Sequence, residues 1–294
     1  MKVVKVGKKY NGKKLSNFLF DSFDGLTNNT FNKALRKKDI RINDVKVSEN
    51  MTVYEGDEIK VYIVDDLLMK NKSVSDIKIE IIYEDSNIVI YNKPAGIEVT
   101  GKDSVESYAR TQYENQFIEP CHRLDRNTTG LVVFAKNKES LDTILEMFKN
   151  QKVIKHYRCV VVGIPKKDSQ VMEAFLFKDT KKSMVYVSDI QKTGYRKIIT
   201  SYRVIKKDLK NDLAVLDVEL HTGRTHQIRA HLAHIGHPIL GDGKYGVNSI
   251  NKKFKLNNQQ LCSYSLEFKF DDEDNKLCYL NNKKFTLNKY QLFI

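Results

Sequence analysis

The spacing of apolar residues near the N-terminus predicts a small unit of two helices and short strands. Two stretches have apolar residues at helical spacing, and N-cap residues at Thr27–Thr30 precede the second. The apolar positions are Leu15, Phe18 and Leu19 in the first stretch and Phe31, Ala34 and Leu35 in the second. Arg41–Asn43 is expected to be a short strand, and the alternation in Glu58–Ile63 predicts another. Residues 1–64 are therefore expected to form a small α+β domain.

After a polar stretch with little periodicity, residues 65–78, the pattern changes to short apolar runs rich in β-branched residues. The predicted strands are Ile79–Tyr83, Ile88–Tyr91, Leu131–Ala135, Lys155–Gly163, Val171–Phe177, Ile198–Ile205, Leu213–Leu220, Gln260–Phe270 and Lys284–Ile294. The predicted helices are Val105–Tyr113, a segment with Leu141, Ile144, Leu145 and Phe148 on one face, and Thr225–Ile235. Many strands with few helices predict an α+β domain with an extended, largely antiparallel sheet over residues 79–294, joined to the first domain by a linker at 65–78.

The formal net charge of +13 adds a partner to this picture, because a strongly basic chain favours a polyanion such as nucleic acid. A high lysine content without a binding site would produce the same number. The four cysteines are far apart, which argues against a disulfide framework and for a reducing cytoplasm. No apolar run has the length of a membrane span, and the N-terminus lacks a signal-peptide core, so no membrane association is expected.

Basic residues gather at the end of the second predicted helix, in a group called here the basic cluster. Its members are Lys33, Arg36, Lys37, Lys38 and Arg41. Basic residues at a helix C-terminus complement the helix dipole, but five within nine positions exceed that need. The cluster is therefore predicted to bind RNA phosphates.

The stretch Cys121–Lys136, CHRLDRNTTGLVVFAK, places a charged turn in front of a predicted buried strand. Asp125 is the only acid between Glu119 and Glu139 and has an arginine nearby on each side in sequence, which favours its ionised form. A positioned carboxylate can act as a nucleophile. The alternative is a structural Arg–Asp pair beside a turn, and this stretch alone leaves both open.

Two further segments carry candidate functional side chains. Tyr157 lies on a predicted strand, where it can stack on a base or pack in the core with a hydrogen-bonded hydroxyl. Five of the seven histidines lie between His221 and His237, which raises the question of a metal site. The absence of HExxH and of cysteine ligands argues against a metal there.

These segments together resemble the RluA class of pseudouridine synthases. HRLDRNTTG is similar to the class signature, in which the Asp is the catalytic nucleophile, here Asp125. NKPAG, at Asn92–Gly96, resembles the segment ahead of the active site, and the strand around Tyr157 resembles the KxYxAxVxG motif, whose Tyr packs on the uracil and is a candidate base for the last proton. In the third block, GRTHQIR, the resemblance implies that Arg224 pairs with Asp125. In the last strand motif, Leu261-Cys262-Ser263 replaces the usual LHA.

The resemblance implies a bent, mostly antiparallel mixed sheet with flanking helices, preceded by a small domain like the RNA-binding domain of ribosomal protein S-four. It implies an enzyme that isomerises uridine to pseudouridine in structured RNA. Large-subunit ribosomal RNA is the expected substrate, and transfer RNA is left open. The enzyme is expected to be a monomer that needs no metal or cofactor. Asp125 either attacks the anomeric carbon or assists removal of a sugar proton. The RNA-binding residues expected outside the basic cluster are Arg123, Arg126, His226, Gln227 and Arg229. A non-catalytic RNA-binding or ribosome-assembly protein is the alternative; a glycosidase, which usually needs a second carboxylate, is a weaker one.

Overall fold

The computed structural model describes residues 1–63, 68, 78–114, 116–271, 273–289 and 292. The chain divides into two compact units, Met1–Ile77 and Lys78–Ile294. Most of the predicted linker, residues 65–78, lies outside the described residues. Leu68, which is described, is buried in the core of the first unit, and its carbonyl accepts a hydrogen bond from the Gly25 amide (3.2 Å). The first unit therefore extends beyond the predicted boundary at residue 64.

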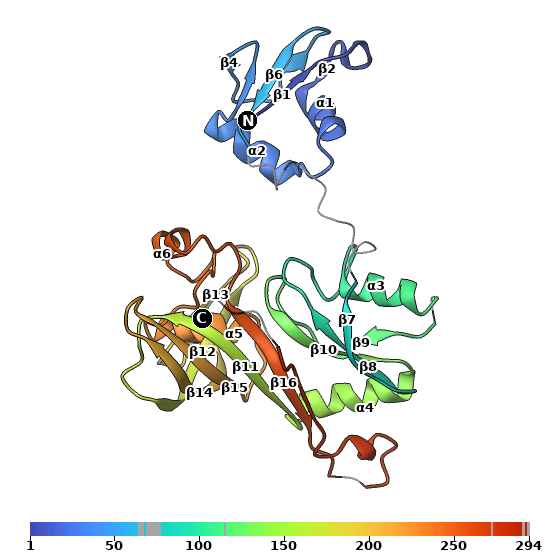
Figure 1. Ribbon diagram of the computed structural model, residues 1–294, viewed down its shortest axis with the longest axis vertical. Helices are drawn as coiled ribbons and strands as arrows, with labels where there is room; N and C mark the ends of the chain where they lie inside the picture. The colour runs from blue at the N-terminus through green and yellow to red at the C-terminus, as the bar shows by residue number, and fades with distance from the viewer. Residues whose placement is uncertain (64–67, 69–77, 115, 272, 290–291, 293–294) are drawn as a thin grey trace. The chain divides into compact units, whose positions relative to one another are not determined.

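The first unit is a small α+β fold built on a four-stranded sheet (Figure 1). The sheet has the order β1 (Lys2–Lys5), β6 (Glu58–Val61), β3 (Ile40–Ile42) and β4 (Val45–Lys46), and β2 (Lys13–Lys14) pairs with β5 (Thr52–Val53). The helices are the short 3-10 helix η1 (Lys8–Tyr10), α1 (Leu15–Ser22) and α2 (Asn28–Lys37). The Thr27 side chain caps α2 by accepting from the Thr30 amide at 3.2 Å, as the sequence predicts.

The basic cluster lies at the C-terminal end of α2 and on β3. Lys33, Arg36, Lys37 and Lys38 are exposed. Arg41 is half-buried, and its guanidinium lies 5.0 Å from the centre of the Tyr62 ring. Four of the five side chains therefore have free access to a polyanion, while the fifth is held against the sheet.

The second unit contains an eleven-stranded mixed sheet. Its order is β13-β12-β14-β15-β11-β16-β10-β8-β7, with β17 beside β16 and β9 beside β10. The strands are β7 (Glu80–Glu84), β8 (Ile88–Lys93), β9 (Glu119–Pro120), β10 (Thr129–Ala135), β11 (Val153–Val162), β12 (Ser169–Asp179), β13 (Met184–Ser188), β14 (Arg196–Asp208), β15 (Leu213–Leu220), β16 (Leu261–Phe268) and β17 (Lys284–Thr286). All pairs are antiparallel except β10 with β16. The predicted last strand, 284–294, ends at Thr286, and residues 290, 291, 293 and 294 lie outside the described residues.

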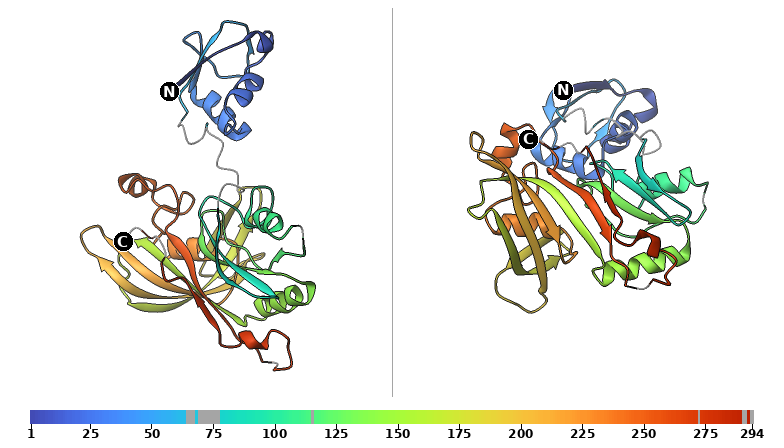
Figure 2. Two further views of the ribbon diagram at one scale, coloured as in Figure 1. Left: turned by 45° about the vertical axis from the view of Figure 1, so that its right-hand side comes forward. Right: turned by 60° about the horizontal axis from the view of Figure 1, so that its bottom comes forward.

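The long strands β11 and β16 cross the middle of the sheet, and its two halves are set at an angle on either side of them (Figure 2). The helices of this unit are α3 (Val105–Gln112), α4 (Lys138–Lys149), α5 (Gln227–His234), α6 (Asn248–Lys253) and the short 3-10 helix η4 (Cys278–Leu280). α4 belongs to the half containing β8 and β10, and α5 to the half containing β13 and β14. The predicted bent mixed sheet with flanking helices is confirmed.

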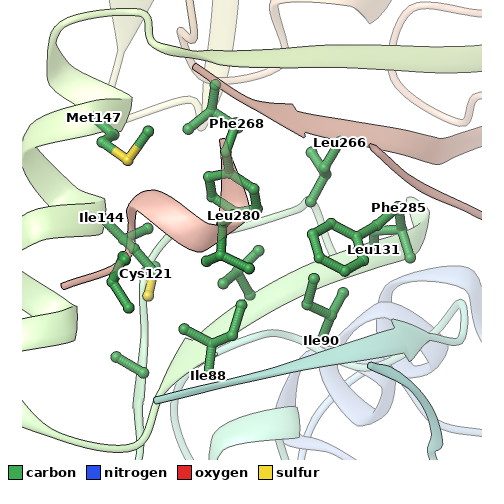
Figure 3. Packing of buried hydrophobic residues seen from close by; sticks show 14 of the residues in the cluster. Ile88, Ile90, Cys121, Leu131, Ile144, Met147, Leu266, Phe268, Leu280 and Phe285 are labelled. Atoms are coloured by element: carbon green, nitrogen blue, oxygen red, sulfur yellow. The ribbon is translucent and has the colours of Figure 1, made fainter. Parts of the chain in front are cut away.

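A buried apolar cluster holds α4 on the first half of the sheet (Figure 3). Ile144 and Met147 of α4 join Ile88 of β8, Leu131 of β10 and Leu266 of β16. Burying aliphatic side chains of this size stabilises a fold by about 1.5–3 kcal/mol each. Because β10 is fixed on both sides in this way, the loop in front of it has a rigid base.

Gly130 permits the parallel contact between β10 and β16. Its φ is +110°, and a Cβ at this position would lie 2.1 Å from the Ser263 carbonyl oxygen. The glycine of the HRLDRNTTG motif is therefore required by the close approach of two strands far apart in sequence.

We expect Gly130→Ala to lower the free energy of unfolding by roughly 3–5 kcal/mol, because it adds backbone strain and a steric clash. Chemical denaturation measures the change. Gly243→Ala is the matched control, since its φ is unstrained and a Cβ there meets no atom within 4 Å. Equal stability of the two variants would contradict the close approach.

Candidate active site

Asp125 lies in the loop that enters β10, at the wall of a pocket of about 580 Å³. The amide of Thr128 donates to the Asp125 carbonyl (3.0 Å), which closes the turn, and the Thr128 hydroxyl accepts from the side-chain amide of Gln259 (2.7 Å). Leu124 is buried and anchors the loop. The Asp125 side chain remains about one-fifth exposed, with a relative accessibility of 22%. The loop is thus fixed on both sides of a carboxylate that a ligand can reach.

A buried lysine, Lys93, holds the loop that carries Asp125. The ammonium of Lys93, at the end of β8, donates to the carbonyls of Pro94, Ile97 and Arg126, each at 2.8 Å. Burial lowers the pKa of Lys93 to about 7, and the nearby charge of Asp125 opposes that shift. Three carbonyl acceptors require three N–H donors, so the protonated amine is the form that ties the NKPAG turn to the Asp125 loop. The sequence indicates the turn but gives no sign that this lysine is buried.

The ion-pair partner of Asp125 is Arg229, not Arg224 as predicted. Nη1 of Arg229 donates to Oδ2 of Asp125 at 2.8 Å, and within the described ranges no ion pair joins Asp125 to Arg224. Arg229 lies on the buried face of α5, whereas Arg224 belongs to the exposed turn before the helix. Arg229 is buried but lines the pocket, so its predicted direct contact with RNA stays a prediction.

A second carboxylate, Asp242, orients Arg229. Its two oxygens accept from Nε and Nη2 of Arg229 at 2.7 and 3.0 Å, a bidentate arrangement. The amides of Lys244 and Tyr245 also donate to Asp242. Burial raises the pKa of Asp242, but Arg229 and these amides outweigh it and hold the pKa below its usual range. No local pattern links Asp242 to Asp125, because Asp242 follows α5 by several residues; its only sign in the sequence is the polar segment GDGKYG.

His226 borders the other oxygen of Asp125. It is the N-cap of α5, with a left-handed φ of 52°, where the sequence predicts Thr225. The Tyr245 hydroxyl accepts from the Val185 amide and is therefore free to donate to Nδ1 of His226, at 2.8 Å. Burial lowers the pKa of His226, so the neutral ring carries its proton on Nε2, which lies 4.0 Å from Oδ1 of Asp125.

Gln227, predicted to contact RNA, lines the pocket and also binds the turn and the sheet around it. It is buried, and its amide nitrogen donates to the Ile199 carbonyl and the Thr200 hydroxyl, both at 3.0 Å. Its oxygen accepts from the Thr222 hydroxyl and from the Arg224 amide. All of these bonds lie within the turn and the sheet, so Gln227 shapes the turn that carries Arg224, and its predicted contact with RNA stays a prediction.

Tyr157 extends from β11 into the same pocket and is almost fully buried. Burial is the main cause that raises the pKa of Tyr157. Its hydroxyl is therefore protonated at neutral pH, and its ring is available as an apolar surface. Asp125, Tyr157 and Arg224 all line this pocket.

The two arginines flanking Asp125 are both exposed but differ in their contacts. Arg126 donates from Nε to the Gly96 carbonyl (2.8 Å), while Arg123 lines the pocket.

Across the described residues, no group of three or more His, Cys, Asp or Glu side chains could hold a metal ion. In the same residues, no helix is long and apolar enough to cross a bilayer.

A family model, sequence relatives and a solved structure all relate this chain to one family. Residues 87–234 match the family described as RNA pseudouridylate synthase. The chain is 30% identical over 94% of its length to ribosomal large subunit pseudouridine synthase C of Buchnera aphidicola subsp. Acyrthosiphon pisum (strain APS), of which it covers 91%. It is 32% identical over 79% of its length to the protein of the same name from Rickettsia typhi, of which it covers 82%. The structure named human RNA pseudouridylate synthase domain containing 1 has the same fold, with a TM-score of 0.59 at 21% identity over 76% of this chain and 94% of that one.

Proposed function

The chain belongs to the RNA pseudouridylate synthase family, and from this premise we propose that it isomerises uridine to pseudouridine in large-subunit ribosomal RNA, with Asp125 as the nucleophile. The observation that carries the proposal is the partly exposed carboxylate of Asp125, held by Arg229 in a pocket shared with Tyr157. The ribosomal substrate is supported by the names of the relatives and by the exposed basic cluster on α2.

The ion pair divides the work between the two oxygens of Asp125. Oδ2 accepts from Arg229, while Nε2 of the neutral His226 lies 4.0 Å from Oδ1. We assign the reacting role to Oδ1. In one route Oδ1 bonds to the anomeric carbon as the bond from that carbon to uracil N1 breaks, and this bond to Oδ1 breaks again when carbon five of the turned uracil bonds to the sugar. In the other route Oδ1 takes a proton from the sugar as the bond to N1 breaks, and the proton returns to the sugar when carbon five bonds to the anomeric carbon. In both routes carbon five then loses its proton to water and N1 gains one from water.

Tyr157 is assigned to packing on the uracil rather than to removing the last proton. A phenol whose pKa is raised by burial is a poor base at neutral pH, while its ring offers a flat surface for stacking. Charge that develops on the uracil needs preorganised donors near it. The Nε2–H of His226 and the side chain of Arg224, both at this pocket, are the candidates.

The proposal is tested by release of tritium from RNA labelled at carbon five of uridine, with large-subunit ribosomal RNA and transfer RNA as separate substrates. Release from the ribosomal RNA, with pseudouridine found in the product, is expected. A non-catalytic RNA-binding protein binds but releases nothing, and a glycosidase frees uracil. Mapping pseudouridines in a strain that lacks the gene identifies the target nucleotide.

We expect the basic cluster to set the salt dependence of RNA affinity. Replacing Lys33, Arg36, Lys37 and Lys38 with Ser in the full-length protein should reduce the slope of log affinity against log salt by about 0.7–0.9 for every phosphate that the variant no longer neutralises. A variant with Ser at Lys166, Lys167, Lys178 and Lys210, exposed on the second unit, is the control.

Deletion of residues 1–77 should also reduce the slope of log affinity against log salt. It should leave turnover on short RNA, because no proposed catalytic group precedes Asp125. An unchanged slope would assign docking to the second unit.

A further inference from the structure

The pocket extends beyond Asp125, Tyr157, Arg224 and His226 to a set of residues called here the Lys155 subsite. Its members are His122, Phe148, Lys149, Gln151 and Lys155. Lys155 and Tyr157 are two residues apart on β11 and both line the pocket, so about 7 Å of strand separates them. The subsite is therefore within the span of a nucleotide whose base packs on Tyr157.

Lys155 is a buried lysine whose ammonium has no hydrogen-bonding partner among the described residues. The residue is 7% exposed, burial lowers its pKa, and within the same part of the chain no ion pair involves it. Its one close aromatic contact is the Phe148 ring, whose centre is 5.8 Å from Nζ. Lys93, which is also deeply buried, has three carbonyl acceptors. Nζ of Lys155 is not among the fully buried polar atoms that lack a partner, so it has access to the pocket, and the described residues offer it no acceptor there.

The neighbouring histidine cannot supply the missing acceptor. Nε2 of His122 accepts from the Val133 amide at 3.1 Å. Burial lowers the pKa of His122 to about 3, and the charge of Lys155 adds to the shift. The ring is therefore neutral with its proton on Nδ1, so Nε2 already accepts from Val133 and Nδ1 carries a hydrogen and cannot accept.

The charges of the pocket wall favour an anion at this place. The lining residues include Arg123, Lys149, Arg224 and Lys155, and the one acid among them, Asp125, already pairs with Arg229. In an RNA strand the anionic group is the phosphodiester, and lysine is a common phosphate ligand. We propose that Lys155, with Lys149 at the rim, binds the phosphodiester adjoining the target uridine. This inference rests on the RNA substrate of the proposed function and adds a binding subsite to it.

The test compares the binding of uridine, uridine 3′-monophosphate and uridine 5′-monophosphate to the full-length protein, by NMR titration. Wild type should bind one of the two monophosphates about tenfold more tightly than uridine, and which one it prefers identifies the side of the nucleotide. Lys155→Met should bind uridine as wild type does and lose the preference. Lys152→Met is the matched control, because the Lys152 ammonium pairs with Asp271 (2.7 Å) and does not line the pocket.

Three results would overturn the inference. The first is that wild type shows no preference for either monophosphate over uridine. The second is that Lys155→Met retains the preference. The third is that Lys155→Met loses affinity for uridine as much as for the monophosphate, which would assign Lys155 to the base. The melting temperature of Lys155→Met gives a second readout. It should equal or exceed that of wild type, since an unpaired buried charge is removed, and a lower value would mean that Lys155 supports the fold. None of these measurements needs turnover, so failure of the isomerisation assay is a separate outcome.

Discussion

Replacement of Asp125 by Asn is expected to reduce pseudouridine formation at least roughly a thousandfold while RNA affinity changes by less than about twofold. Asn has nearly the shape of Asp, and its amide oxygen can still accept the hydrogen bond that Arg229 gives to Oδ2. It has no carboxylate to attack the sugar or to take its proton. The loop should keep its form, because its other contacts come from backbone and threonine groups. Tritium release measures the chemistry, and filter binding on the same RNA measures affinity.

The matched control for this variant is Asp142→Asn. Asp142 is an exposed aspartate on α4 that pairs with Lys138, and it does not line the pocket. The control removes the same charge from the same unit, so it should keep full activity. Residual activity of Asp125→Asn above a tenth of wild type would refute the nucleophile assignment. Equal loss of binding and turnover would instead indicate a collapsed loop.

Local pattern was enough to predict most strands and helices of this chain. Alternation and β-branched runs identify β6, β8 and β15 because each strand buries residues that the pattern itself displays. The capping threonine of α2 is likewise a local signal, since its side chain and the amide that it binds are three residues apart. Asp125 could be singled out for the same reason, as a lone acid in a basic turn before an apolar run.

The partners of Asp125 depend on tertiary packing that no local pattern contains. GRTHQIR offers two arginines, and the choice between them depends on where α5 begins and which of its faces packs against the sheet. The helix begins at Gln227, so Arg229 turns inward and Arg224 stays in the turn. Gly130 illustrates the same limit, because its requirement comes from the Ser263 carbonyl of β16. Such residues become interpretable only when distant strands are brought together.

Replacement of Arg229 by Met is expected to lower the free energy of unfolding by about 3–5 kcal/mol, the usual cost of leaving a buried charge without its partner. Asp242 is fully buried and loses both bidentate hydrogen bonds, and Asp125 loses its ion pair. Turnover should fall by at least about a hundredfold, because the carboxylate of Asp125 is no longer oriented. Arg224→Met is the matched control, with stability within about 0.5 kcal/mol of wild type, since its side chain is exposed.

The loss of stability in Arg229→Met should depend on pH in a definite direction. In the wild type the pKa of Asp242 is held below its unfolded value, so this group contributes stability above that value, which is lost as pH falls through the folded pKa. Without Arg229, burial dominates and raises the pKa of Asp242, so the variant gains relative stability on acidification. The difference in unfolding free energy should therefore be largest at neutral pH, shrink as pH falls from neutral towards about 4, where the variant gains stability, and shrink further below about 4, where the wild type loses it. Adding Asp242→Asn to Arg229→Met should recover part of the loss at neutral pH. A constant difference across this range, or an equal loss in Arg224→Met, would contradict the assignment of Arg229 as the residue that joins the two carboxylates.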